Sequence, residues 1–238
     1  MDLAYLVILG SCALLSLAAS LAVRARYARA SRVMVAGGMS GAEAARAIID
    51  HAGIDARIVQ HDGFLSDHYN PATRTLALSS DVYHGRHAAA VGVAAHEAGH
   101  ALQHAENYLP MWARSALVPL AGIGSNLGPW LVIAGIAFGA GAAAAPGWAH
   151  VLALAGVGTF ACATAFSLVT LPVEFDASAR ARRALDRLAI VSSAEERAAV
   201  SGVLTAAGLT YVAAAVGSLL QLVYWASRIG LFGGQNRE

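Results

Sequence analysis

Charged residues are scarce in this 238-residue sequence. They make up 13% of it and apolar residues 57%, against about 25% and roughly 45–50% in an ordinary soluble domain. With so little charge a soluble fold would lack polar surface, which points to a membrane protein. The formal net charge is only +1. That value argues against nucleic acid as a partner, because such binding needs a clustered excess of basic side chains.

Cysteine is nearly absent as well. Cys12 and Cys162 are the two cysteines, and both lie in apolar stretches, where a thiol packs as a small hydrophobic group. Two residues cannot form a disulfide framework, and no CxxC pair exists to bind zinc or to carry redox chemistry. Any metal chemistry must therefore come from other side chains.

Four apolar stretches without charge are long enough to cross a bilayer, whose hydrocarbon core needs about 20 helical residues. We predict transmembrane helices at residues 3–23, 115–140, 148–171 and 201–227. The first is expected to be a retained anchor and not a signal peptide, because Asp2 precedes it and arginines follow it. The last could instead lie in the membrane interface.

Arginines gather after the first span, from Arg24 to Arg32, and after the third, from Arg180 to Arg187. The positive-inside rule therefore places residues 24–114 and 172–200 in the cytoplasm, and places the protein in the cell membrane as a multi-pass protein. Arg228 fits this arrangement less well, since a fourth crossing would leave it outside.

The segment of residues 24–114 carries nine arginines and eight acidic residues, which is typical of a small water-exposed domain. Ser40 is expected to cap a helix that ends at Gly53. Strands are expected at residues 56–60 and 73–78. The second strand could be an exposed edge that binds an extended peptide.

An alanine-rich helix is predicted over residues 82–107, capped by Asp81, and it contains the sequence HEAGH. His96 and His100 are four residues apart on one helical face, so both imidazoles can reach one zinc ion. Glu97 is placed to accept a proton from the attacking water during hydrolysis of an amide. Zinc would polarise the scissile carbonyl and lower the pKa of water.

A catalytic zinc usually has a third protein ligand, and Glu174 is our choice because the predicted topology brings it to the side of HEAGH. Asp176 is expected to orient a ligand histidine and not to bind the metal. His104 continues the four-residue spacing, but one straight helix rarely wraps three ligands around an ion. Glu106 has the spacing of the third ligand in metzincins, yet Gln103 stands where the required glycine would be.

Most other histidines are interpreted as surface or turn residues. His68 and Tyr69, in the sequence SDHYN, are weaker candidates that could line the cleft and donate to the oxyanion of the substrate.

Four segments closely resemble the YugP-type membrane zinc metallopeptidases: residues 65–71, 78–86, 93–103 and 171–181. The resemblance implies a multi-pass membrane protein with a gluzincin-like site, similar in outline to HtpX-type and CAAX-prenyl endopeptidases. In that pattern a glutamate on a later helix is the third ligand, a role that falls to Glu174. In those relatives an aspartate follows this glutamate by four positions, whereas this sequence has Ser178. Asp176 could substitute for it.

Taken together, the sequence predicts a mainly α protein, with multi-pass membrane helices and a small α+β zincin-like cytoplasmic metallopeptidase domain. The expected function is a zinc-dependent endopeptidase with one Zn²⁺ per chain, acting on membrane-associated proteins or peptides. The alternative is a membrane scaffold protein that holds zinc without catalysis. A transporter is disfavoured because the predicted spans contain only one ionisable group, His150, near an end. The oligomeric state stays open.

Overall fold

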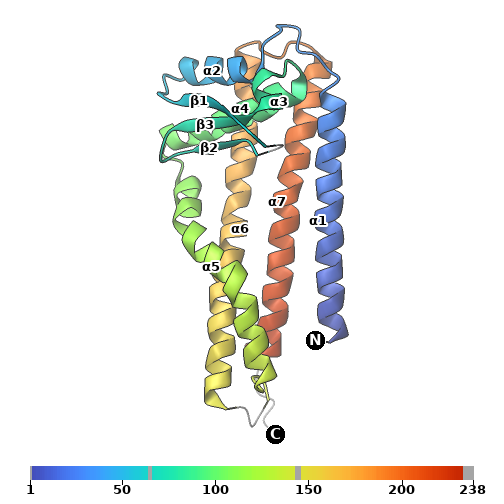
Figure 1. Cartoon of the computed structure of the whole chain (residues 1–238), viewed down its shortest axis with the longest axis vertical. Helices are drawn as coiled ribbons and strands as arrows, with labels where there is room; N and C mark the ends of the chain where they lie inside the picture. Colours follow the sequence, from blue (N-terminus) through green and yellow to red (C-terminus); the bar gives the residue numbers. More distant parts are fainter. Residues whose placement is uncertain (1, 64–65, 143–145, 233–238) are drawn as a thin grey trace. The chain divides into compact units, whose positions relative to one another are not determined.

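The computed structural model describes residues 2–63, 66–142 and 146–232, and most of these residues are helical (Figure 1). The chain divides into two compact units, each assembled from separated segments. The apolar unit contains residues 1–16, 112–171 and 211–238, and the polar unit contains residues 17–111 and 172–210. Four helices, α1 (Leu3–Ala30), α5 (Leu109–Ala137), α6 (Gly147–Arg187) and α7 (Ala194–Arg228), contribute to both units.

Within the described residues, four helices are long and apolar enough to cross a membrane, namely α1, α5 (Leu109–Ala137), α6 and α7. Each of them overlaps one of the four stretches predicted from the sequence. The apolar window of α1 buries none of its residues inside the chain, and side chains such as Leu6 and Leu14 are exposed. Lipid is the natural environment for such a surface. The limits of the membrane-crossing parts stay predictions.

Small residues bring α5 and α6 close together in the apolar unit. A Cβ added at Gly135 would lie 2.7 Å from Ala153, and one added at Gly156 would lie 2.6 Å from the backbone nitrogen of Val132. Close backbone approach of this kind is a common way for helices to associate in lipid, where the hydrophobic effect gives no help.

Side chains at the end of α7 contact the residue before α1 in the apolar unit. The Tyr224 hydroxyl on α7 donates to Asp2 over 2.9 Å, and Arg228 pairs with the same carboxylate over 3.6 Å. The end of α7 therefore lies beside the start of α1. Arg228, which fits the positive-inside rule poorly, has its counter-charge here.

The first helix that lies wholly in the polar unit is α2 (Gly41–His51), which has the predicted N-cap. Glu43 N donates to Ser40 Oγ, and Ser40 N donates to the Glu43 carboxylate over 2.7 Å, so the two residues form a capping box. Gly53 follows the helix with a φ of 65°, a conformation that glycine adopts without strain.

A three-stranded sheet follows, formed by β1 (Arg57–His61), β2 (His68–Asn70) and β3 (Thr75–Ser79). The strand order is β1-β3-β2, with β3 parallel to β1 and antiparallel to β2. The prediction that the strand near residues 73–78 is an edge strand was wrong, because β3 lies in the middle. Its successive residues Leu76, Ala77 and Leu78 are all buried, as expected for a strand covered on both faces.

The prediction of a single helix over residues 82–107 was also wrong. The structure has two helices there, α3 (Ser80–His84) and α4 (Ala88–Ala105). Between them the chain pairs with the segment after α1: Val35 N donates to Arg86 O, and Ala88 N donates to Val33 O over 2.8 Å. This long-range pairing overrides the helical propensity of the local sequence.

The sequence predicted Asp81 as a helix cap, but Asp81 does not cap α3. Ser79 is the N-cap residue, without a side-chain capping bond. The Asp81 carboxylate instead accepts a hydrogen bond from the Tyr27 hydroxyl on α1.

Helix α6 runs without interruption from the apolar unit into the polar unit, through Pro172. The helix predicted to span residues 148–171 therefore does not end at Leu171, and Glu174 lies well inside α6. The change from apolar to charged composition after Leu171 marks a change of environment and not a helix end. Residues 188–193 then connect α6 to α7.

Candidate metal centre

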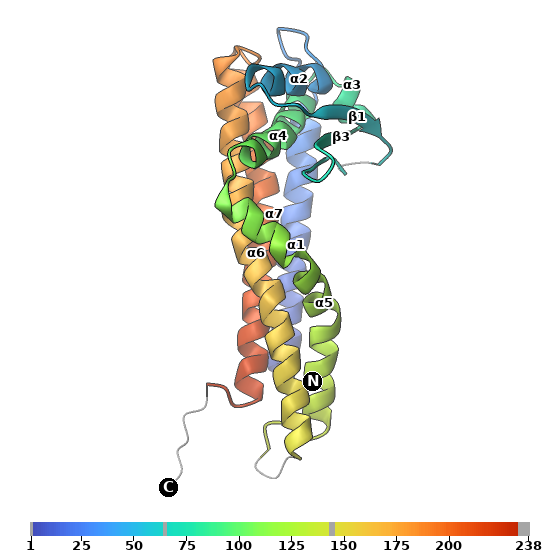
Figure 2. The same ribbon diagram turned by 90° about the vertical axis from the view of Figure 1, so that its left-hand side faces the viewer.

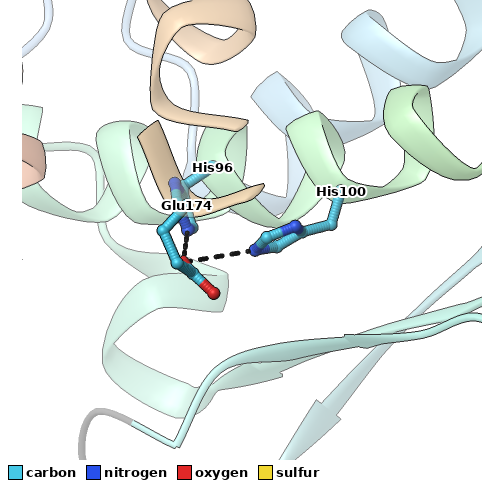
Figure 3. Close-up of side chains that lie close together, drawn as sticks. All are labelled: His96, His100 and Glu174. Atoms are coloured by element: carbon cyan, nitrogen blue, oxygen red, sulfur yellow. Dashed lines mark hydrogen bonds and ion pairs between the residues drawn. The ribbon is translucent and has the colours of Figure 1, made fainter. Parts of the chain in front are cut away.

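Three side chains in the polar unit bring metal-binding atoms together. His96 and His100 project from α4, and Glu174 reaches them from α6 (Figure 3). Glu174 Oε2 lies 3.1 Å from His96 Nε2 and 3.6 Å from His100 Nε2. Within the described ranges this is the group of histidine and acidic side chains that could hold an ion, with its donor atoms all within 4.8 Å of one another.

The donor set and its spacing fit zinc. Two imidazoles and one carboxylate match the ligands of gluzincin-type catalytic sites. Metal–ligand bonds of about 2.0–2.2 Å in a tetrahedron put ligand atoms roughly 3.4 Å apart. The two distances to Glu174 lie on either side of this value. Three protein ligands also leave a fourth position for water or substrate, as a catalytic site requires.

A glycine in the motif allows the two helices to meet. Helix α4 crosses α6 in the polar unit (Figure 2), and a Cβ added at Gly99 would lie 2.5 Å from the backbone oxygen of Ala177. Ala177 is almost one helical turn after Glu174. The contact at Gly99 thus sets how closely Glu174 approaches the histidines on the neighbouring turn of α4.

Glu97 is buried beside this group, with 7% of its surface exposed. Among the described residues it has neither a side-chain hydrogen bond nor an ion pair. Its negative charge acts on His100. A buried carboxylate without a competing partner is available to accept a proton.

The electrostatics of the group favour positive charge at His100. Burial alone would lower the pKa of His100, but the hydrogen bond to Glu174 and the negative charges of Glu97 and Glu174 outweigh it, and the pKa is raised. A site that favours an added proton in this way also favours a divalent cation between the same groups.

Each histidine is held at its second ring nitrogen. Ser178 Oγ lies 3.1 Å from His96 Nδ1, and Gln103 Oε1 lies 3.0 Å from His100 Nδ1. Because the Gln103 oxygen can only accept, His100 donates from Nδ1, and in the neutral ring this leaves the lone pair of Nε2 to bind a metal ion. Partners of this kind fix the tautomer and the ring orientation of metal-binding histidines.

Asp176, which was expected to orient a ligand histidine, contacts the partner of a histidine and not the histidine itself. Its carboxylate accepts from Gln103 Nε2 over 2.9 Å and from Arg180 Nε over 2.5 Å. Gln103 Nε2 also donates to Val173 O. Asp176 is thus linked to His100 through the fully buried Gln103 amide.

The two alternative third ligands lie outside the group. The Tyr69 hydroxyl is 2.8 Å from His104 Nδ1, and Glu106 forms an ion pair of 2.6 Å with Arg180. Both residues therefore have other partners.

The two weaker candidates lie on β2. His68 is exposed, and its ring contacts Ser66 O and the ring of His61. The Tyr69 hydroxyl is hydrogen-bonded to His104 on α4, and its side chain packs against the hydrophobic core of the polar unit. Leu65, the first residue of the segment that carried the family resemblance, lies outside the described residues.

Sequence reasoning did not assign a role to Gln103 or to Ser178 as histidine partners. Helical spacing could have indicated both residues. Gln103 is three residues after His100, on the same face of α4, and Ser178 is four residues after Glu174, on the same face of α6.

Comparisons with known proteins agree with the site. A family model described as "Putative neutral zinc metallopeptidase" matches residues 5–230. A protein of Bacillus subtilis (strain 168) named "Putative membrane protease YugP" is 40% identical over 212 residues, covering 88% of this chain and 89% of that protein. No solved structure matches. With a family match over nearly its whole length and a relative of this identity, the chain belongs to the family described as "Putative neutral zinc metallopeptidase".

Proposed function

We propose that this protein is a zinc-dependent endopeptidase embedded in the membrane. His96, His100 and Glu174 would hold one zinc ion per chain, and Glu97 would be the general base. The observation that carries the proposal is the convergence of the three donor atoms within 4.8 Å, with the buried Glu97 on the same turn of α4. The four apolar helices support the membrane location.

Zinc in this position would supply a Lewis acid for the scissile carbonyl and an activated water. Glu97 would accept a proton from the attacking water as it adds to the amide carbon, and would then deliver that proton to the leaving nitrogen. Gln103 would keep His100 in the tautomer that presents Nε2, and Ser178 would hold the ring orientation of His96. The apolar residues around the motif would exclude bulk water and strengthen these interactions.

The edge strand β2 is the natural place for substrate. The strand order leaves its outer backbone groups unpaired within the described sheet, and Tyr69 on β2 contacts His104 on α4, one turn beyond His100. An extended peptide could add to β2 as a further strand, with main-chain hydrogen bonds that suit many sequences. The sequence had suggested that the strand at residues 73–78, now β3, binds an extended peptide. We propose this role for β2 instead.

We further propose that the site faces the cytoplasm. The support is the arginine distribution, with clusters at Arg24–Arg32 and Arg180–Arg187. Substrates would then be proteins or peptides at the cytoplasmic surface of the membrane.

The test is a Glu97→Gln variant, purified in detergent beside wild type and a Glu106→Gln control. We expect equal zinc content in all three proteins, measured by inductively coupled plasma mass spectrometry. Cleavage of casein should fall about 10²- to 10⁴-fold in Glu97→Gln and should stay near wild type in Glu106→Gln.

The same comparison separates the peptidase from a scaffold that holds zinc without turnover. A structural site has no need of a general base, so a scaffold would show no cleavage in wild type and no effect of the substitution. Undiminished cleavage by Glu97→Gln would refute the mechanism while leaving the metal site intact.

A further inference from the structure

A cavity of about 480 Å³ opens in the polar unit, away from the three metal-binding side chains. It is bounded by the end of α2, the end of α4 and the last turns of α6. None of His96, His100, Glu97 or Glu174 lines it. Its walls differ in chemistry: one is cationic and the other is apolar.

The cationic wall comes from α6. Arg183 and Arg187 lie one helical turn apart on the same face and both line the cavity, with His51 from the end of α2 across from them. Both guanidinium groups are exposed. In the described part of the chain neither forms an ion pair with a carboxylate. Two like charges at this spacing repel each other, so an anion between them would stabilise the arrangement.

The cavity also contains a third arginine and one acid, and these neutralise each other. Arg180 pairs with Glu106 over 2.6 Å and with Asp176, and both Arg180 and Glu106 line the cavity. The neighbouring acids have partners as well, since Asp50 pairs with Arg46 and Asp186 pairs with Arg197. The charge left over in the cavity is therefore positive.

The opposite wall is apolar. It is formed by Ile48 from α2, Ala52 just after α2, Leu102 from α4 and Leu188 after α6. A bare inorganic anion would leave this wall unused. A ligand that joins an anionic head to an apolar body would use both walls, and the volume is within the range of small-molecule sites.

The position along α6 favours a ligand from water over a lipid. About 18 Å of helix separates Arg183 from Leu171, at about 1.5 Å per residue, and Leu171 is the last residue of the predicted span. The headgroup region of one leaflet is only about 5–8 Å thick.

We propose that this cavity binds the phosphate group of a small, water-soluble organic phosphate, held by Arg183 and Arg187 with its organic part against Ile48 and Leu102. Guanidinium groups bind phosphate oxygens in bidentate fashion, which gives geometry as well as charge. The proposal goes beyond peptide hydrolysis and does not depend on it, because no proposed zinc ligand takes part.

The test is calorimetric titration of the full-length protein, carrying its metal, with phenyl phosphate. The titration is done twice, once with the protein in detergent and once with the protein in phosphatidylcholine nanodiscs. The key variant is Arg183→Gln/Arg187→Gln, and its control is Arg57→Gln/Arg74→Gln, which removes the same charge from the sheet region. A second variant, Ala52→Trp, fills the cavity from an exposed position and keeps both arginines.

We expect one saturable site per chain in wild type and in the control. Affinity should fall at least tenfold in Arg183→Gln/Arg187→Gln and in Ala52→Trp, with unchanged thermal unfolding. Absence of saturable binding to wild type, or equal weakening in the control, would overturn the proposal. Binding that survives in both cavity variants would assign the phosphate to the metal centre instead.

The same experiment shows whether the phosphate bound in the cavity belongs to a lipid headgroup. If phenyl phosphate fails to bind in phosphatidylcholine nanodiscs, and anionic phosphatidylglycerol is retained by wild type but lost from Arg183→Gln/Arg187→Gln, the cavity is a headgroup site and the soluble ligand is refuted.

Discussion

The hydroxyl of Ser178 lies 3.1 Å from Nδ1 of His96. The expected resemblance to HtpX-type and CAAX-prenyl endopeptidases would have placed an aspartate there. His96 therefore has a neutral partner, and the nearest acid on the same helix, Asp176, is directed to Gln103 instead. Both histidines of the group are thus held by neutral side chains, a hydroxyl and an amide. The negative charge of Asp176 reaches His100 only through the Gln103 amide and does not contact the ring directly.

Loss of this hydroxyl should weaken the metal site without removing a ligand. In Ser178→Ala the His96 ring would lose the partner that fixes its orientation, and we expect zinc affinity to fall about 10- to 100-fold. Competition with a fluorescent zinc chelator would measure it. Ser80→Ala, at an exposed serine of the same unit, serves as control. Equal affinity in the two variants would show that Ser178 does not position His96.

Gln103 should contribute to both stability and metal binding. It is fully buried and joins His100, Asp176 and Val173 O. Gln103→Leu would leave buried polar partners unsatisfied, at a cost of about 1–3 kcal/mol, and would release the His100 tautomer. We expect a lower midpoint of thermal unfolding in the metal-free protein together with weaker zinc binding. A variant with normal zinc affinity would limit Gln103 to a role in packing.

The HEAGH motif could be predicted from the sequence because it depends only on residue spacing within one helix. Four-residue spacing on an alanine-rich helix places His96 and His100 on one face whatever the rest of the chain does. The approach of Glu174 was inferred from membrane topology and from family resemblance. Its real basis, the close crossing of α4 and α6 at Gly99, is a tertiary contact that no local pattern encodes.

The errors in the polar unit have the same origin. The helix over residues 82–107 was predicted from propensity, but pairing of the chain around Val35 with Arg86 interrupts it. Strand β2 is three residues long and polar, so it gave no alternating pattern. Without β2, the middle strand β3 was mistaken for an edge.

Metal content should identify the third ligand. We expect Glu174→Ala to lose most of its zinc after dialysis against a weak chelator, because only two donors would remain. Glu106→Ala and His104→Ala should keep zinc near one equivalent per chain, since their side chains bind Arg180 and Tyr69. The measurement is mass-spectrometric zinc content on equal amounts of folded protein. Zinc retained by Glu174→Ala and lost from Glu106→Ala would move the site to the other acid.

The orientation in the membrane can be tested with two single cysteines in a background with Cys12→Ala and Cys162→Ala. The positive-inside rule predicts that the turn before β3 is cytoplasmic and that the start of α6 is on the opposite side. A membrane-impermeant maleimide should therefore label Gly147→Cys in intact cells, and should label Thr73→Cys only after the cells are broken. The reverse pattern would place the proposed active site outside the cell.

The crossing at Gly99 offers the most direct test of how the fold makes the site. In Gly99→Ala the new Cβ would lie 2.5 Å from the backbone oxygen of Ala177, which cannot move away as a side chain could. The helices must separate, at a cost of about 1–3 kcal/mol, and Glu174 then moves away from both imidazoles.

Gly92→Ala, on the same helix, is the matched control. Its new Cβ would come closest to the side chain of Val200, at 3.3 Å, and alanine favours the helix by roughly 1 kcal/mol over glycine. We expect zinc affinity to fall at least tenfold in Gly99→Ala and to stay unchanged in Gly92→Ala, with thermal unfolding measured on both. Equal zinc binding in the two variants would mean that the approach of Glu174 does not depend on this crossing.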